Sequence, residues 1–125
     1  MFKRFNLFIL LILFAAIFSC KKNQTGGNAV VSGTVVHHTK AIANARIYIK
    51  FNSSEFPGDD YKLYDTYVDA DVDGKYKINL YKGTYYLYAK GYDLEIPSPY
   101  LVKGGLSVTV RTNEKLQKNI AITED

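Results

Sequence analysis

Residues 66–92 constrain the fold more than any other stretch of the sequence. Apolar and polar side chains alternate there on both sides of Asp73-Gly74, and they alternate again after Lys82-Gly83. A period of two is typical of antiparallel strands that bury one face. Asp-Gly is a frequent type I′ hairpin turn, because both residues tolerate positive φ. We therefore predict three short strands joined by two tight turns.

The alternation also predicts which side chains of this stretch face the core: Tyr76, Ile78, Leu80, Tyr85, Leu87 and Ala89. Leu80, Gly83 and Tyr85 occur in the frame L-x-x-G-x-Y. In β-sandwiches a tyrosine at such a corner folds back, and its hydroxyl bonds backbone a few residues upstream. We expect this structural role for Tyr85, and an outward orientation for its neighbour Tyr86.

The same period of two marks further strands near residues 30–36, 45–51, 106–110 and 116–122. No window outside the first 19 residues has the apolar stripe of a helix. The prediction is therefore an all-β fold, a seven-stranded antiparallel β-sandwich of Ig-like or transthyretin-like type, after an N-terminal signal peptide.

Five pieces of the sequence follow one another in order: VSGTV at 31–35, IANARI at 42–47, TYVD to DGKY at 66–76, GTYYL at 83–87 and GY at 91–92. Together they resemble the carboxypeptidase regulatory-like domains, which have a transthyretin-like (prealbumin-like) sandwich fold. The resemblance covers about residues 29–123, and it departs from the family pattern at the missing proline near Ile42 and at an insert between Phe51 and Tyr61. It implies a module that accompanies peptidases and is not itself a peptidase.

The N-terminus has the pattern of a secretory signal. Lys3 and Arg4 precede an apolar run at 7–18, which is shorter than the roughly 20 residues of a membrane-spanning helix. Ser19-Cys20 follows, and a cysteine in that position resembles a bacterial lipobox. The resemblance implies lipidation of Cys20 and cleavage before it. A plain signal anchor with an incidental cysteine is the alternative.

These features divide the chain into a lipoprotein signal peptide at 1–19, a lipidated Cys20 with a flexible tether at 20–28, and a regulatory-like β-sandwich domain at 29–125. Lys21 stands where an inner-membrane retention signal has aspartate, and no acidic run of the surface-export type follows. We expect a lipid anchor at the periplasmic face of the outer membrane, with the cell surface as the alternative. Cys20 is the only cysteine, which excludes an internal disulfide.

The clearest metal-like pattern is Asp69-x-Asp71-x-Asp73-Gly74, the first half of a calcium loop. The second half of the calcium-loop pattern is not matched, because Leu80 occupies the position at which the loop needs a bidentate glutamate. We predict a turn that holds no metal. If calcium binds this chain, these three aspartates are the candidate ligands.

His37 and His38 are the only histidines, and as neighbours on a strand they would point to opposite faces. We therefore expect a solvated loop there rather than a shared metal. With no further histidine to activate a serine, and with no zinc-peptidase signature, we predict no enzyme activity and no cofactor. Lys3 and Arg4 belong to the signal segment, and without them the formal net charge falls from +4 to +2. This charge is spread along the chain and indicates no nucleic-acid partner.

Tyrosine is the unusual component of the composition, with 11 residues. Tyr48, Tyr86 and Tyr88 are predicted to point outward and are the candidate ligand-binding residues, because exposed aromatic rings stack on sugars and anchor protein partners. The alternative is that they only stabilise strand pairs.

Taken together, these features predict a lipid-anchored, non-catalytic β-sandwich module of the bacterial cell envelope, structural or protein-binding. The alternative is a carbohydrate-binding or nutrient-capture accessory lipoprotein that uses the exposed tyrosines. The expected partners are the membrane, through the N-terminal lipid, and an envelope protein or a glycan.

Overall fold

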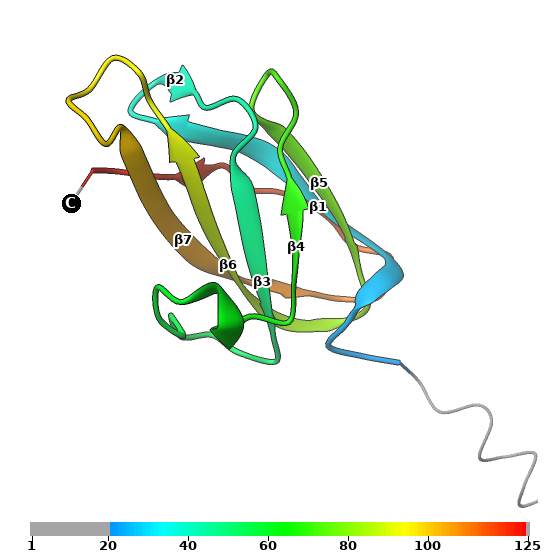
Figure 1. Cartoon of the computed structure of the whole chain (residues 1–125). Helices are drawn as coiled ribbons and strands as arrows, with labels where there is room; N and C mark the ends of the chain where they lie inside the picture. Colours follow the sequence, from blue (N-terminus) through cyan, green and yellow to red (C-terminus); the bar gives the residue numbers. More distant parts are fainter. Residues whose placement is uncertain (1–20, 125) are drawn as a thin grey trace, which may run out of the picture.

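The computed structural model describes residues 21–124, which form a β-sandwich of two packed sheets (Figure 1). The predicted signal peptide and Cys20 lie outside the described residues. Among residues 21–124, no helix is long and apolar enough to cross a membrane.

The first sheet is organised around one long strand, β1 (Thr25–His37). β1 pairs antiparallel with β2 (Lys40–Ala41) and with β5 (Lys75–Leu80). It also pairs in parallel with two short C-terminal strands, β8 (Lys115–Gln117) and β9 (Ile120–Ala121). The sheet is therefore mixed, whereas the sequence pattern predicted antiparallel pairing throughout.

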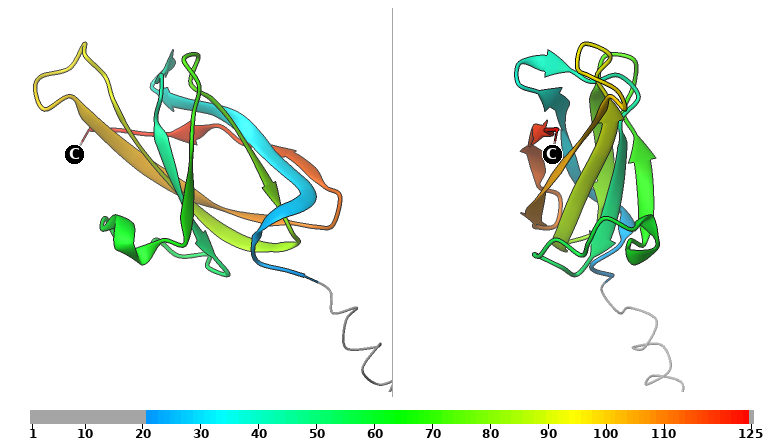
Figure 2. Two further views of the ribbon diagram at one scale, coloured as in Figure 1. Left: turned by 45° about the vertical axis from the view of Figure 1, so that its right-hand side comes forward. Right: turned by 60° about the vertical axis from the view of Figure 1, so that its left-hand side comes forward.

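The second sheet has the strand order β4-β3-β6-β7, with antiparallel neighbours throughout. Its strands are β3 (Arg46–Phe51), β4 (Thr66–Asp69), β6 (Gly83–Tyr92) and β7 (Leu101–Val110). A single 3₁₀ turn, η1 (Tyr61–Leu63), lies in the long loop between β3 and β4. Figure 2 shows from the side that β1 and the C-terminal strands form one layer, and that β3, β4 and β6 belong to the other.

The predicted three-stranded meander at 66–92 is wrong. β4 lies in the second sheet, β5 crosses to the first, and β6 returns to the second. The turn at Asp73-Gly74 is a corner between sheets, and only Gly74 has a positive φ, of 74°, whereas a type I′ turn needs two such residues. Both sheets bury their inner faces in the same core, so alternation determines which way a side chain points but not which strand it pairs with.

The predicted inward faces are confirmed. The inward residues of 66–92 named above are each at most 4% exposed, and they meet their counterparts from β1, β3, β7 and β9 in one apolar core. The fully buried residues of this core run from Ala29 near the start of β1 to Ile122 just after β9. Residues 21–124 therefore contain every described strand and the apolar core that these strands share, and the prediction of an all-β sandwich is confirmed.

The predicted tether at 20–28 extends too far into the domain. β1 already begins at Thr25, and the backbone N–H of Asn23 donates to the carbonyl of Lys82 at 2.9 Å. The amide of Tyr81 in turn donates to the carbonyl of Gln24 at 2.9 Å. Polar, glycine-bearing composition suggested a solvated linker, but backbone groups bond irrespective of side-chain polarity.

The predicted last strand at 116–122 is divided into β8 and β9 by Lys118 and Asn119. At this break the chain passes close over Gly33 of β1. A Cβ atom at position 33 would lie 2.0 Å from the carbonyl oxygen of Lys118, so only glycine fits. The same carbonyl accepts a hydrogen bond from the hydroxyl of Tyr76 at 2.5 Å, which holds the crossing segment against the core.

Candidate ligand-binding face

The candidate site is the outer face of the β4-β3-β6-β7 sheet. Strand register places Tyr67, Tyr48 and Tyr88 opposite one another in a single row across β4, β3 and β6. The rings of Tyr48 and Tyr67 meet edge to face with centroids 6.3 Å apart. Aromatic pairs opposite one another on neighbouring strands stabilise the sheet as well as presenting their rings.

The loop between β3 and β4, residues 52–65, folds over one half of this row. Tyr64 stacks on Tyr88 with centroids 5.8 Å apart and an interplanar angle of 11°, and Phe56 lies 5.0 Å from the same ring. Tyr86 is half-buried beside Phe56. The three predicted residues therefore all lie on this face, but Tyr88 is only 4% exposed because the loop covers it.

Asp59 fastens this loop to the sheet. Its carboxylate accepts a hydrogen bond from the hydroxyl of Tyr88 and forms ion pairs with Lys90 at 3.2 Å and Lys103 at 3.5 Å. The bonds from Tyr88 and Lys90 hold the pKa of Asp59 below its usual range. Burial also raises the pKa of Tyr64, a residue of this loop, far above its ordinary value. Tyr88 therefore supports the loop, and its hydroxyl is already engaged.

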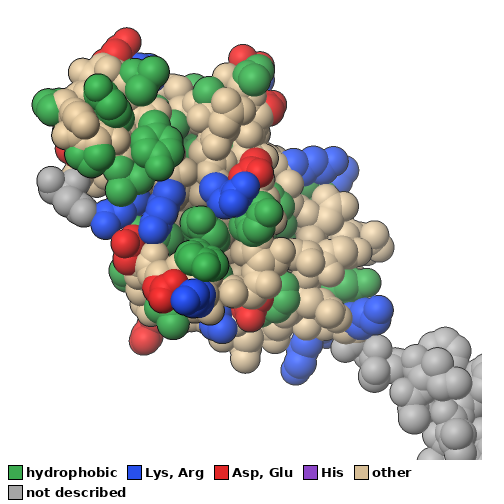
Figure 3. Space-filling view, in the orientation of Figure 1, with side chains coloured by type: hydrophobic (Ala, Val, Ile, Leu, Met, Phe, Trp, Pro, Cys, Tyr) green, Lys and Arg blue, Asp and Glu red, His purple; other side chains and the backbone are tan. Residues whose placement is uncertain are grey.

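The other half of the row is open. The Arg46 guanidinium lies 4.0 Å from the centroid of the Tyr67 ring, and its Nε donates to Asp69 at 2.8 Å. This hydrogen bond to Asp69 raises the pKa of Arg46. An open pocket of about 500 Å³ lies here and is lined by Arg46, Tyr48 and Tyr92 among others. Figure 3 shows this face, where apolar side chains lie between Lys or Arg and Asp or Glu.

Sequence reasoning missed Arg46, Tyr67 and Tyr92 as members of this site. Alternation along β3 puts Arg46 on the same face as Tyr48, but no signal showed that β3 and β4 are neighbours. Their pairing, with Arg46 opposite Asp69, follows from the register of two strands separated by a long loop. That register depends on tertiary packing and cannot be inferred from the period of either strand alone.

The aspartates of the calcium-like pattern do not converge. Asp69 is held by Arg46, as described above, while Asp71 accepts hydrogen bonds at 2.9 Å from the backbone amides of Asp73 and Lys75. Asp71 thus acts as a turn residue, in the manner typical of aspartate in tight turns.

The expectation that His37 and His38 point to opposite faces is wrong. β1 ends at His37, and His38 has a φ of 55° in the turn that follows. This left-handed conformation interrupts the alternation, and the two rings lie with centroids 4.4 Å apart. Among the described residues, side chains of metal-ligating type converge at His37, His38 and Glu124.

Comparison with known proteins adds information on the fold. No protein-family model matches the sequence, and no curated protein matches it. A crystal structure of a DUF3823 family protein from Parabacteroides merdae is similar, with a TM-score of 0.51 and 15% sequence identity over 78% of this chain. The match covers 47% of that chain, so the protein spans about half the length of this structural neighbour. The likeness concerns the sandwich fold alone.

Proposed function

We propose that the protein is a lipid-anchored, non-catalytic β-sandwich module of the bacterial cell envelope that binds a partner protein. The observation that carries this proposal is the open half of the outer face, where Arg46 stacks on Tyr67 beside Tyr48 and Tyr92. Tyrosine and arginine are enriched at the energetic centres of protein interfaces. Tyr67 and Tyr92 are 51% and 66% exposed, so their rings are accessible to a partner.

The charges on this face favour binding over catalysis. A carboxyl group that acts as a general acid needs a raised pKa, whereas hydrogen bonds lower the pKa of Asp59. Asp69 and Arg46 are paired with each other. The resemblance to carboxypeptidase regulatory-like domains supports the same conclusion, because such domains accompany enzymes without performing their chemistry.

Two observations support the proposed anchor, the sequence around Cys20 and the position at which the fold begins. Cys20 would carry the lipid, and the first backbone hydrogen bond into the sandwich is made by Asn23. Only Lys21 and Lys22 separate these two residues, so the domain would lie directly on the membrane. Basic residues so close to the surface would add attraction to anionic head groups, about 1 kcal/mol each. The periplasmic face of the outer membrane is the proposed location, with the cell surface as the alternative.

Carbohydrate binding is the second candidate function. The cavity of about 500 Å³ is in the size range of small-molecule sites and combines the ring of Tyr48 with polar groups of Asn44 and Asp69. Aromatic faces beside amide and carboxylate groups suit the alternating apolar and hydroxyl surfaces of sugars.

Site-specific photo-crosslinking in living cells tests the binding proposal. A crosslinking residue at Tyr67 or Tyr92 should yield adducts of discrete mass, whereas one at Lys77, exposed on the opposite sheet, should not. Equal labelling at all three positions would contradict a binding face. If Tyr67 and Tyr92 give no protein adduct but a glycan array retains wild-type protein and loses Tyr48→Ala, the carbohydrate alternative holds.

Metabolic labelling with a fatty acid tests the anchor. Wild-type protein should incorporate the label, and Cys20→Ser should remain as unprocessed, unlabelled precursor. Unlabelled wild-type protein in the soluble periplasm would exclude the proposed anchor while leaving the binding face untouched.

A further inference from the structure

The most unusual polar group of the described chain is the imidazole of His37. It lies at the end of β1, is 4% exposed, and its Nδ1 is 2.7 Å from Oδ2 of Asp93. Asp93 is itself buried, in the segment that follows β6, so this pair joins the two sheets. A carboxylate only accepts hydrogen bonds, and therefore Nδ1 carries the proton and donates it.

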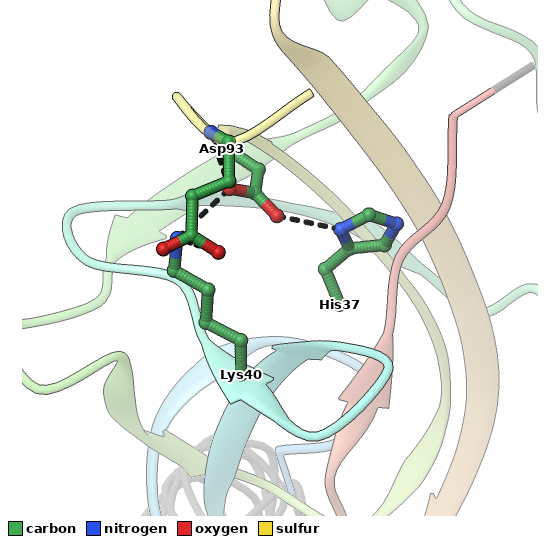
Figure 4. Close-up of polar contacts among 4 residues, drawn as sticks. His37, Lys40 and Asp93 are labelled. Atoms are coloured by element: carbon green, nitrogen blue, oxygen red, sulfur yellow. Dashed lines mark hydrogen bonds and ion pairs between the residues drawn. The ribbon is translucent and has the colours of Figure 1, made fainter.

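The orientation of Asp93 is held by its other bonds. Oδ1 accepts from Nζ of Lys40 at 2.9 Å and from the backbone amide of Glu95 at 3.0 Å. Figure 4 shows Asp93 between Lys40 and His37, with the imidazole turned so that its second nitrogen points away from the carboxylate. The ring of His37 is thus fixed from the Nδ1 side.

The second nitrogen of this ring has no hydrogen-bond partner among the described residues. This atom, Nε2 of His37, is buried. Buried polar atoms of folded proteins nearly always have a partner, so an exception calls for a water or an ion at that position. In Figure 4 this nitrogen faces the C-terminal segment, which pairs alongside β1 through the Ile122 amide and the Val36 carbonyl at 2.8 Å.

Two further ligand-type side chains lie beside the imidazole of His37. One ligand atom from each of His37, His38 and Glu124 is within 4.8 Å of those of the other two. His38 and Glu124 are exposed, so both can adjust to an ion that the rigid His37 positions. The left-handed turn at His38 and the parallel pairing of β9 with β1 are what bring these three residues together.

We propose that His37, His38 and Glu124 form a binding site for a divalent transition-metal ion of the zinc class. Two imidazoles and one carboxylate suit Zn²⁺, Cu²⁺ or Ni²⁺ rather than the oxygen-seeking Ca²⁺ or Mg²⁺. Metal-binding histidines commonly donate their other ring N–H to a carboxylate, which is the relation of His37 to Asp93. Three protein ligands, of which His38 and Glu124 are exposed, leave the fourth position to water or to a group from a partner.

Zinc titration of a tag-free 21–125 fragment tests this proposal, since that fragment contains the complete core and lacks Cys20 as a competing thiol. Calorimetry of metal-stripped protein should give one zinc per chain, and zinc should raise the melting temperature, because it binds the folded state. Cobalt(II) substitution should produce the visible d–d absorption of a Co²⁺ ion in a four-coordinate site.

His37 is a poor position for a variant, because its loss would also leave Asp93 unpaired in the core. His38→Ala and Glu124→Gln change exposed ligands instead, and Glu55→Gln, in the distant 52–65 loop, is the matched control. Even outer-sphere partners of a metal site contribute about 10- to 100-fold in affinity, so loss of either ligand should weaken zinc binding at least that much. The proposal is overturned if the wild type does not bind zinc, or if His38→Ala or Glu124→Gln leaves the zinc affinity unchanged. It is also overturned if the control Glu55→Gln weakens zinc binding as much as the ligand variants do.

Discussion

The hydroxyl of Tyr85 donates a hydrogen bond to the backbone carbonyl of Tyr81, four residues earlier in the chain, at 2.7 Å. It also lies 3.1 Å from the carbonyl of Gln24, and the ring meets Phe51 edge to face. Tyr85 is fully buried, so this one side chain fastens the β5–β6 corner to the first residues of the sandwich. The structural role predicted from L-x-x-G-x-Y is confirmed.

The first prediction compares Tyr85 with its neighbour. Tyr85→Ala leaves a cavity and removes the hydrogen bond to the Tyr81 carbonyl, and should lower the free energy of unfolding by about 3–5 kcal/mol. Tyr85→Phe removes only the hydrogen bonds and should cost about 1–3 kcal/mol. Tyr86→Ala, on the outer face beside Phe56, should cost about 1 kcal/mol or less. Chemical denaturation of the 21–125 fragment measures all three, and equal losses for the two alanine variants would contradict the assigned faces.

A second prediction concerns the close passage of the chain over Gly33. Gly33→Ala drives a methyl group into the Lys118 carbonyl, and should lower stability by about 3 kcal/mol or prevent β8 and β9 from docking. Ser32→Ala, one residue earlier with an outward side chain, should change stability by no more than about 0.5 kcal/mol. Urea unfolding compares the two variants. A tolerated Gly33→Ala would mean that the C-terminal strands do not cross β1 here.

The third prediction concerns the loop fastened by Asp59. Tyr88→Phe removes the hydroxyl that bonds Asp59, and should lower stability by about 1 kcal/mol. Because the change is local, amide exchange within residues 52–65 should accelerate more than exchange in the core strands. Tyr86→Phe provides the control, since its ring lies on the same face. Similar exchange in both variants would show that the Tyr88 hydroxyl does not hold the loop.

A fourth prediction concerns alkaline pH. Burial raises the pKa of Tyr76 to about 12, from an ordinary value near 10. A raised pKa in the folded state means that the stability associated with the neutral phenol is complete below pH 10 and is lost as the pH rises toward 12. At 1.36 kcal/mol per pKa unit, the loss across this window is at most about 3 kcal/mol.

The measurement is the free energy of unfolding between about pH 9 and 12, for wild type and for Tyr76→Phe. The variant should be less stable at neutral pH, because the Lys118 carbonyl loses its partner, but should show a shallower alkaline decline. Parallel declines would show that Tyr76 does not titrate in this range.

Much of the fold is predictable from side-chain alternation alone. The period of two predicts the inward residues of β5 and β6, the apolar face of β3 and the fold class. It does so because the face that a strand buries depends only on the order of residues along that strand. Strand partners do not follow from it. β4 and β5 flank a tight turn yet belong to different sheets, and the parallel pairing of β1 with β8 joins segments about 85 residues apart.

The candidate site was predictable only in part for the same reason. Tyr48 and Tyr86 lie where alternation placed them, but the cover over Tyr88 comes from Phe56 and Tyr64 in a loop without periodicity. The convergence of His37 and His38 depends on a single positive φ, which is rare for a residue other than glycine and leaves no mark in the sequence pattern.

The parallel pairing of β1 with β8 and β9 determines how the domain responds to mechanical load. The described chain enters at one end of β1 and leaves beside the other, with bonds such as Val30 to Glu114 and Ile122 to Val36, both 2.8 Å, spread along the strand between them. Tension between the two termini acts along these strands, so it strains all of these bonds together instead of opening them one after another. A sandwich connected in this way resists pulling between the ends of the described chain through shear of parallel strands, not through their sequential opening.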